Sequence, residues 1–200
     1  MAHGGEMNVG FSSNEGVPWL RDVSPQELRR ILDVTHRVHG LLAVITDLDT
    51  LLDRVMQECK AVASAEACSL MLYDPQSQGL HFHVALGEKG DQQRLKQQIR
   101  LQVGQGVAGM AAALRKPINV EDVKRSQLWY WPADEVTQFQ TRAVLAVPLL
   151  DRDQLIGVVE VLNKQDGGPF TEADLHVMEI FSSVVATAIC LLYTSDAADE

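Results

Sequence analysis

The spacing of apolar residues changes once along this chain, and the change limits the folds that the chain can adopt. From Leu28 to Val62 apolar residues recur every three or four positions, as they do on one face of a helix. From Cys68 onward they alternate with polar residues, as they do in a half-buried strand. The pattern predicts two N-terminal helices, with a junction near Thr46, followed by a β-sheet.

Turn residues divide the second part into further elements. A turn that begins at Asp74 interrupts the alternation, which resumes at Leu80, Phe82 and Val84. This predicts an antiparallel hairpin with those three residues on the core face. Residues 121–140 are polar and irregular but long enough to fold over a pocket as a lid. The other expected elements are a strand near 98–103, a glycine-rich turn at 104–109, a short helix at 110–115, strands at 116–120, 143–150 and 154–163, and a helix that Thr171 caps and that runs to about Tyr193.

Composition divides the chain into four segments. Residues 1–24 are rich in Gly, Ser and Asn, lack a secretory signal pattern, and are expected to be disordered. Residues 25–46 form a linker helix with a heptad-like stripe, which either pairs with a second copy or packs on its own domain. Residues 47–193 form the ligand-binding domain. Residues 194–200 neither continue nor cap the last helix, so we interpret them as a non-native-looking tail on a fragment of a longer protein.

Charge and cysteine usage exclude several classes of function. The formal net charge of −10 repels phosphate backbones and argues against direct nucleic-acid binding. No apolar run reaches the roughly 20 residues of a membrane span. The cysteines Cys59, Cys68 and Cys190 are widely spaced, as expected for a protein of the reducing cytoplasm. His81 and His83 lack a third ligand nearby, so we expect no metal site.

Two features predict a binding site. Glu160 lies inside an apolar strand, and burying a carboxylate is costly unless a partner hydrogen-bonds it. It therefore contacts a partner or a ligand, or else lies at a strand edge facing water. The glycines of residues 104–109 precede a helix, whose first amides can hold a phosphate. Alternatively, these glycines serve only the tight turn.

In its order of elements and in one motif, the chain resembles a GAF domain, the small-ligand sensory module of signalling proteins. The motif is Asn-Lys, a spacer, Phe, three residues and Asp-Glu, seen here as Asn163-Lys164, Phe170 and Asp174, with Leu175 in place of the Glu. The resemblance implies an α+β fold, with a central, mostly antiparallel β-sheet, helices packed on one face and a lid over the ligand pocket. It also implies that Lys164 and Asp174 form a structural ion pair.

The chain is most similar to the GAF domains that bind cyclic nucleotides. Their pocket uses a Ser on the first strand, the amides of the glycine turn, a Tyr and an Asp of the lid, two Thr four residues apart, and a strand Glu. The chain departs from these domains at two positions: Gln138 replaces the Gly between the two Thr, and Leu86 replaces an acid that binders of cyclic GMP carry after the second strand. These departures leave the choice between cyclic AMP and cyclic GMP open. The ligand-binding residues that the resemblance implies are Ser69, Val107, Ala108, Tyr130, Asp134, Thr137, Thr141 and Glu160.

The predicted function is regulatory rather than catalytic. We expect a homodimeric sensor that binds a small molecule and signals through its terminal helices to a missing output domain, with no cofactor besides the ligand. Two alternatives remain. The segment around His36 resembles the phospho-acceptor helix of some histidine kinases. Some GAF proteins reduce free methionine sulfoxide with several cysteines at one pocket, although here Cys68 points opposite Ser69 on its strand.

Overall fold

The computed structural model describes residues 24–42, 47–87, 92–128 and 130–196. The predicted disordered segment therefore lies almost entirely outside the described residues, as do the last four residues of the predicted tail. The elements in chain order are α1 (Pro25–Leu42), α2 (Leu48–Val62), β1 (Ala65–Asp74), β2 (Gly79–Gly87), α3 (Gln92–Gln98), β3 (Arg100–Gln102), α4 (Gly106–Leu114), β4 (Ile118–Val120), the 3₁₀ turn η2 (Val123–Arg125), α5 (Trp131–Thr137), β5 (Val144–Asp151), β6 (Gln154–Lys164) and α6 (Glu172–Asp196).

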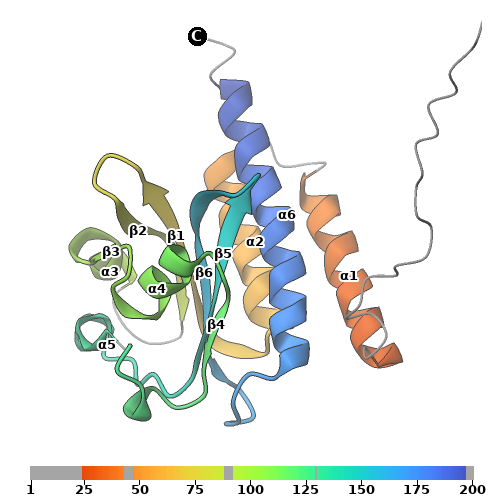
Figure 1. The fold of residues 1–200 in the computed structure, drawn as a ribbon. Coiled ribbons are helices and arrows are strands. Elements are labelled where there is room, and N and C mark those ends of the chain that lie inside the picture. Colours follow the sequence, from red (N-terminus) through yellow and green to blue (C-terminus); the bar gives the residue numbers. More distant parts are fainter. Residues whose placement is uncertain (1–23, 43–46, 88–91, 129, 197–200) are drawn as a thin grey trace, which may run out of the picture.

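The strands form one six-stranded sheet in the order β3-β2-β1-β6-β5-β4 (Figure 1). Every neighbouring pair is antiparallel, so the predicted α+β class with an antiparallel sheet is confirmed. The central strands β1 and β6 come from distant parts of the sequence. Their register sets Ser69 opposite Glu160, and this pairing fixes the position of two predicted site residues.

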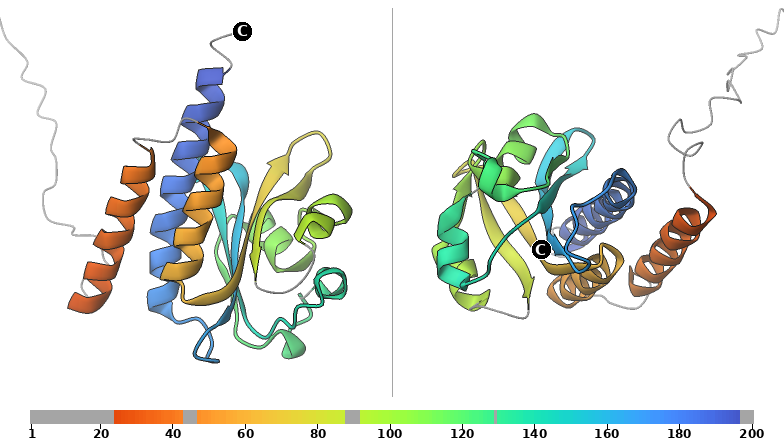
Figure 2. Two further views of the ribbon diagram at one scale, coloured as in Figure 1. Left: turned by 180° about the vertical axis from the view of Figure 1, so that it is seen from behind. Right: turned by 90° about the horizontal axis from the view of Figure 1, so that it is seen from below.

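Helices cover both faces of the sheet, in two different ways. The long helices α2 and α6 pack along one face, with α1 outside them, while α4, α3 and α5 lie over the other (Figures 1 and 2). Leu51, Leu145 and Phe181 belong to the core on the α2 and α6 side, and Ala108 and Val158 to the smaller core on the α4 side. The short helices of the second face form the lid side of the molecule.

Helix α6 is the one described helix that is long and apolar enough to cross a membrane. Half of its Glu172–Cys190 stretch is buried inside the fold, however. That burial is typical of the core helix of a soluble domain, because the apolar side chains already pack on the sheet.

A β-bulge changes the predicted alternation of β2. The register between β1 and β2 shifts between Leu70 and Met71, which leaves His83 as the extra residue. As a result Phe82 packs on the α4 side of the sheet and Val84 on the α2 side. The prediction that both face the same core was wrong, because simple alternation does not show a bulge. His83 Nε2 instead lies 3.0 Å from Asp49 Oδ1 of α2.

Helix α1 packs on its own domain. Ile31, Val34 and Val38 are buried, and Arg30 Nη1 lies 3.4 Å from Asp174 Oδ1 at the start of α6. This is one of the two arrangements that the sequence left open. Leu32 on the outer side of α1 stays 59% exposed, so part of the apolar stripe has no partner within the described residues.

Four helices differ from the sequence prediction. Helix α5 forms within residues 121–140, which we expected to be irregular, and α6 runs to Asp196, so the first three residues of the predicted tail continue the helix after all. Residues 92–98 form α3, which the sequence analysis did not predict. Leu95 and Ile99, four residues apart, are both buried beneath it. Helix α4 begins at Gly106 rather than near Met110, which brings the predicted amides of Val107 and Ala108 into its first turn.

Candidate ligand-binding site

A cavity of about 60 Å³ lies between the sheet and the lid helix α5. Its walls come from β1, β2, α3, α5, the segment after α5, and β6. The walls combine apolar side chains with hydroxyls and carboxylates, as ligand pockets commonly do. The residues that line it are Ala67, Cys68, Ser69, Phe82, Ala85, Leu86, Leu95, Ala133, Asp134, Thr137, Phe139, Thr141, Glu160 and Leu162.

Glu160 is the buried acid of this cavity, with only 6% of the residue exposed. Ser69 Oγ lies 3.5 Å from Glu160 Oε2 and donates a long hydrogen bond to it, and the backbone N–H of Ala108 donates to the same carboxylate. Burial raises the pKa of Glu160 to about 7, although both hydrogen bonds act to lower it. Glu160 therefore has partners inside the protein, and it changes its charge near neutral pH.

The glycine-rich turn positions the first amides of α4. Gly104 and Gly106 have φ values of +91° and +70°, which non-glycine residues rarely adopt. A Cβ at Gly109 would lie 2.4 Å from the carbonyl oxygen of Gln102, so that glycine lets α4 approach the protein's own backbone. The turn thus serves tight packing, and it also aims the Ala108 amide at Glu160.

Asp134 ties the lid helix α5 to the segment that follows it. Thr141 Oγ1 donates a 2.7 Å hydrogen bond to Asp134 Oδ1, and the Thr141 amide donates to Asp134 Oδ2 at 3.1 Å. Thr137 Oγ1 donates to the carbonyl oxygen of Ala133 at 2.9 Å. These polar groups line the cavity, but they bond to one another. A ligand would have to exchange these hydrogen bonds for its own.

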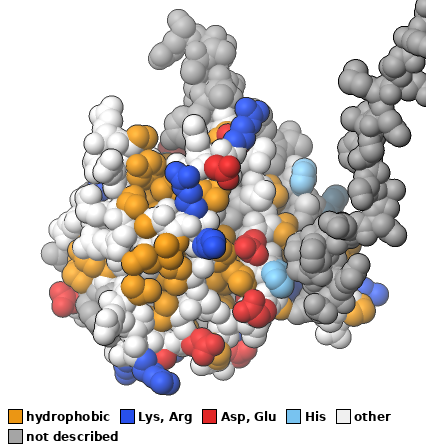
Figure 3. All heavy atoms as spheres, in the orientation of Figure 1, with side chains coloured by type: hydrophobic (Ala, Val, Ile, Leu, Met, Phe, Trp, Pro, Cys, Tyr) orange, Lys and Arg blue, Asp and Glu red, His pale blue; other side chains and the backbone are white. Residues whose placement is uncertain are grey.

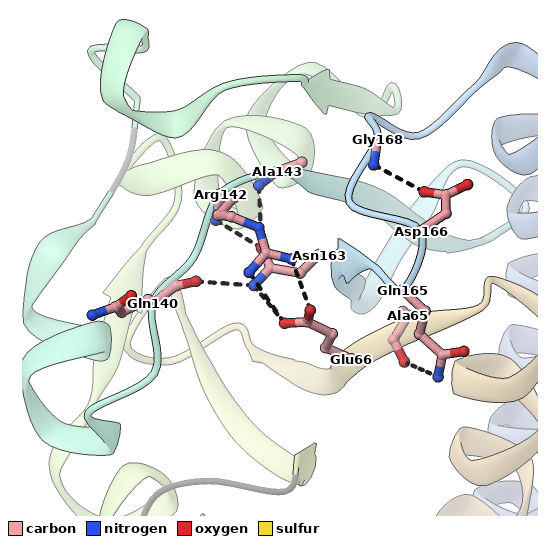
Figure 4. Close-up of polar contacts among 9 residues, drawn as sticks. All are labelled: Ala65, Glu66, Gln140, Arg142, Ala143, Asn163, Gln165, Asp166 and Gly168. Carbon is pink, nitrogen blue, oxygen red and sulfur yellow. Dashed lines mark hydrogen bonds and ion pairs between the residues drawn. The ribbon is translucent and has the colours of Figure 1, made fainter.

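Asn163 anchors the segment that follows the lid (Figure 4). Its Oδ1 accepts from the amides of Arg142 and Ala143, at 2.7 and 3.2 Å. Its Nδ2 donates to Glu66 Oε2 and to the carbonyl oxygen of Gln140, both at 2.9 Å. Asn163 is buried and has a φ of +54°. The Asn of the GAF motif therefore fixes the end of the lid segment to β6.

A second, larger cleft of about 540 Å³ adjoins this anchor. Its walls are polar and include Lys60, Glu66 and Arg142. Arg142 Nη2 and Glu66 Oε1 lie 2.7 Å apart, so these two charges neutralise each other. We therefore place the ligand site at the smaller cavity, where apolar walls and hydroxyls converge.

The predicted ion pair lies away from the cavity. Lys164 Nζ is 2.6 Å from Asp174 Oδ2, and only 1% of the Asp174 side chain is exposed. Burial acts to raise the pKa of Asp174, but hydrogen bonds from Lys164 and Thr171 hold it below its usual value. Thr171 Oγ1 lies 2.9 Å from the same carboxylate and accepts from the Asp174 amide. The pair links β6, the start of α6 and, through Arg30, helix α1.

The cysteines and His36 are the residues on which the two alternative functions, sulfoxide reduction and phosphotransfer, would depend. Burial raises the pKa of Cys59 well above its usual value, and Cys68 Sγ donates to the carbonyl oxygen of Met56 at 3.3 Å. A thiol in such surroundings is a poor nucleophile. Cys190, on α6, also has a raised pKa, because of burial and of Asp151. His36 is exposed on α1.

The structure thus brings five of the eight predicted site residues to one cavity. Ala108 contributes an amide next to it, while Val107 and Tyr130 are absent from its walls. Val107 is buried, and Tyr130 packs with the apolar core on the α4 side. The sequence reasoning missed the apolar walls formed by Leu95 and Phe139, for which the spacing of Leu95 and Ile99 was the available signal. Figure 3 shows that apolar side chains also reach the outer surface near α4.

Comparison with known proteins identifies the family of the chain. A sequence model of the GAF domain matches residues 47–189, and the chain belongs to the GAF-domain family. A relative from Caenorhabditis elegans, the probable 3′,5′-cyclic phosphodiesterase pde-5, is 27% identical over 151 residues, which are 72% of this chain and 21% of the relative. The dual 3′,5′-cyclic-AMP and -GMP phosphodiesterase 11A of Takifugu rubripes is 28% identical over 167 residues, which are 76% of this chain and 18% of that protein. The chain thus spans about a fifth of the length of these relatives.

Solved structures show the same fold. The GAF domain of a phosphoenolpyruvate-protein phosphotransferase from Coxiella burnetii has a TM-score of 0.74 at 18% identity, and the match covers 84% of this chain and 98% of that one. The free methionine-R-sulfoxide reductase of Neisseria meningitidis has a TM-score of 0.70 at 18% identity, with 86% and 95% covered. At this identity the likeness concerns the fold, and the functional argument must come from the site.

Proposed function

We propose that this GAF domain is a cytoplasmic regulatory module that binds a cyclic nucleotide in the cavity beneath α5. The observation that carries the proposal is the convergence of the cavity-lining residues Ser69, Asp134, Thr137, Thr141 and Glu160 from four separate segments. Hydroxyls and helix amides suit phosphate and ribose oxygens, and the acids suit N–H groups of a base. The two cyclic phosphodiesterase relatives support the same ligand class.

The size of the cavity requires the lid to move. Pockets that bury ligands of drug size occupy roughly 300–1,000 Å³, whereas this cavity has about 60 Å³. Helix α5 must therefore shift outward and exchange the Asp134–Thr141 hydrogen bonds for bonds to the ligand. Ligand binding and lid position are then coupled, as a sensory domain requires.

Leu86 bears on the choice of base. It lines the cavity at the position where the resemblance places an acid in binders of cyclic GMP. A leucine offers no acceptor for the N–H groups of guanine. We therefore expect cyclic AMP to bind at least as tightly as cyclic GMP.

The test is thermal unfolding with cyclic AMP, cyclic GMP or AMP. A ligand at 100 times its dissociation constant stabilises the native state by about 2.7 kcal/mol. Thr137→Val should abolish the effect. Thr187→Val is the matched control, because Thr187 Oγ1 also donates to the carbonyl oxygen four residues earlier, but on the exposed side of α6. The proposal would be refuted if neither cyclic AMP nor cyclic GMP stabilised the protein.

The same proposal includes a route for the signal. Helices α1 and α6 meet at Asp174, which bonds Arg30 of α1 and Lys164 of β6, the strand that also carries Glu160. We propose that the domain dimerises through these terminal helices, using the exposed Leu28 and Leu32 of α1, and passes its ligand state to an output domain. Sedimentation should show a dimer that Leu32→Glu converts to a monomer, and a monomeric wild type would refute this part.

A further inference from the structure

One group already occupies the place that the proposed function assigns to the ligand's phosphate. The amide of Ala108, in the first turn of α4, donates to the buried carboxylate of Glu160. The positive end of a helix dipole favours an anion at that position. A phosphate held by the same amide cannot share it with a negatively charged Glu160, since two anions in contact repel each other.

The surroundings of Glu160 supply no compensating positive charge. The neighbours across the sheet are Ser69 on β1 and Ala146 on β5. The titratable groups among the described residues that line the cavity are Cys68 of β1 and Asp134 of α5, besides Glu160, and the described lining contains no Lys, Arg or His. Burial without a cation raises the pKa of Glu160 to about 7. When a phosphate arrives, the repulsion between the two anions is therefore relieved most readily by protonation of Glu160.

We infer that Glu160 occupies the anion-binding end of α4 in the ligand-free protein, and that a phosphate-bearing ligand displaces it with uptake of one proton by its carboxylate. The inference rests on the proposed function. The proton comes from solvent and ends on a carboxylate oxygen, while no bond of the ligand changes. The protonated carboxyl then has an O–H group that can donate to a phosphate oxygen, which the carboxylate cannot do. The domain would thereby bind its ligand more tightly as pH falls.

The test is calorimetric titration with cyclic AMP and cyclic GMP at pH 6, 7 and 8, each in two buffers of different ionisation enthalpy. A phosphodiester keeps its single charge over this range, so the ligand adds no titration of its own. We expect the dissociation constant of the wild type to rise about tenfold between pH 6 and pH 8. The buffer dependence of the heat should give close to one proton taken up per ligand at pH 8.

Two variants separate Glu160 from other carboxylates. Glu160→Gln keeps an acceptor for Ala108 and Ser69 and resembles the protonated acid, so its dissociation constant should be the same at pH 6 and pH 8. Glu135→Gln makes the same change on the exposed side of α5 and should retain the wild-type pH dependence.

The outcomes distinguish this inference from the function on which it rests. Tight binding with equal dissociation constants at pH 6 and pH 8, and no proton uptake, would overturn the inference while leaving the proposed function intact. Absence of binding at every pH, with the protein folded, would refute both. If Glu160→Gln fails to fold, proton uptake by the wild type decides the matter.

Discussion

Replacing Glu160 by glutamine should make the ligand-free protein more stable at neutral and alkaline pH. The residue is 6% exposed, in a cavity whose described walls carry no cation. Its pKa is raised from 4.5 to about 7, because burial penalises the charged form. Below the unfolded pKa the carboxyl is protonated in both states and the native state loses nothing. As pH rises through 4.5 and toward 7, the unfolded chain loses its proton first, so the native state becomes less stable relative to it.

The magnitude follows from the two pKa values. A separation of about 2.5 pKa units at about 1.36 kcal/mol each gives a total loss of about 3 kcal/mol above the folded pKa. Because little of the loss has occurred at pH 5 and nearly all of it at pH 8, the stability difference between Glu160→Gln and the wild type should grow by about 2.5 kcal/mol between these two conditions. The amide keeps an acceptor for Ser69 and Ala108, so the variant loses few contacts of its own.

The assay is urea unfolding of the wild type, Glu160→Gln and Glu135→Gln at pH 5 and pH 8. Linear extrapolation gives the free energy of unfolding for each protein. Glu135 is exposed, so its variant should follow the wild type at both pH values and control for the loss of one carboxylate. A Glu160→Gln difference that is the same at pH 5 and pH 8 would show that burial does not raise the pKa of Glu160, and the reasoning would be refuted.

Three further predictions concern the lid and the ion pair. Lys164→Met should lower the free energy of unfolding by about 3 kcal/mol, because it removes the 2.6 Å partner of the buried Asp174 and leaves only the longer 3.4 Å contact with Arg30. Thermal unfolding measures this, and a loss as small as that of exposed Lys124→Met would contradict it. Thr141→Val should lower the free energy of unfolding by about 1 kcal/mol and speed amide hydrogen exchange in α5, because it removes the 2.7 Å hydrogen bond to Asp134. Unchanged exchange in residues 131–137 would show that this hydrogen bond does not hold the lid. Asn163→Gly should lower the free energy of unfolding by about 3 kcal/mol, because it removes the side-chain hydrogen bonds. Asn163→Ala should lower it by about 1 kcal/mol more, because residue 163 has a positive φ that alanine adopts less readily than glycine. Equal melting temperatures for the two variants would exclude this backbone contribution.

Much of the fold was accessible from the sequence, because local patterns encode it. The change from helical to alternating spacing near Ala65 predicted the order of the elements, and Asp47 caps α2 close to the expected junction, accepting from the Thr50 amide. The bulge at His83 and the start of α4 at Gly106 were not accessible. A bulge leaves only a one-residue change of phase, and a helix made almost entirely of small apolar residues has no amphipathic pattern to mark its start.

The candidate site, too, has features that the sequence predicted and features that it did not. The sequence by itself determined which side chains are available: an acid in an apolar strand, two threonines four residues apart and a glycine-rich turn. Only the tertiary structure decided their partners, since the contacts of Glu160 with Ser69 and Ala108 span more than fifty residues of chain and depend on the pairing of β1 with β6. Local spacing carries no information about which distant backbone amide a buried carboxylate will meet. The packing of α4 against the sheet supplies that amide, and the burial of the carboxylate raises its pKa to about 7, which makes Glu160 sensitive to pH.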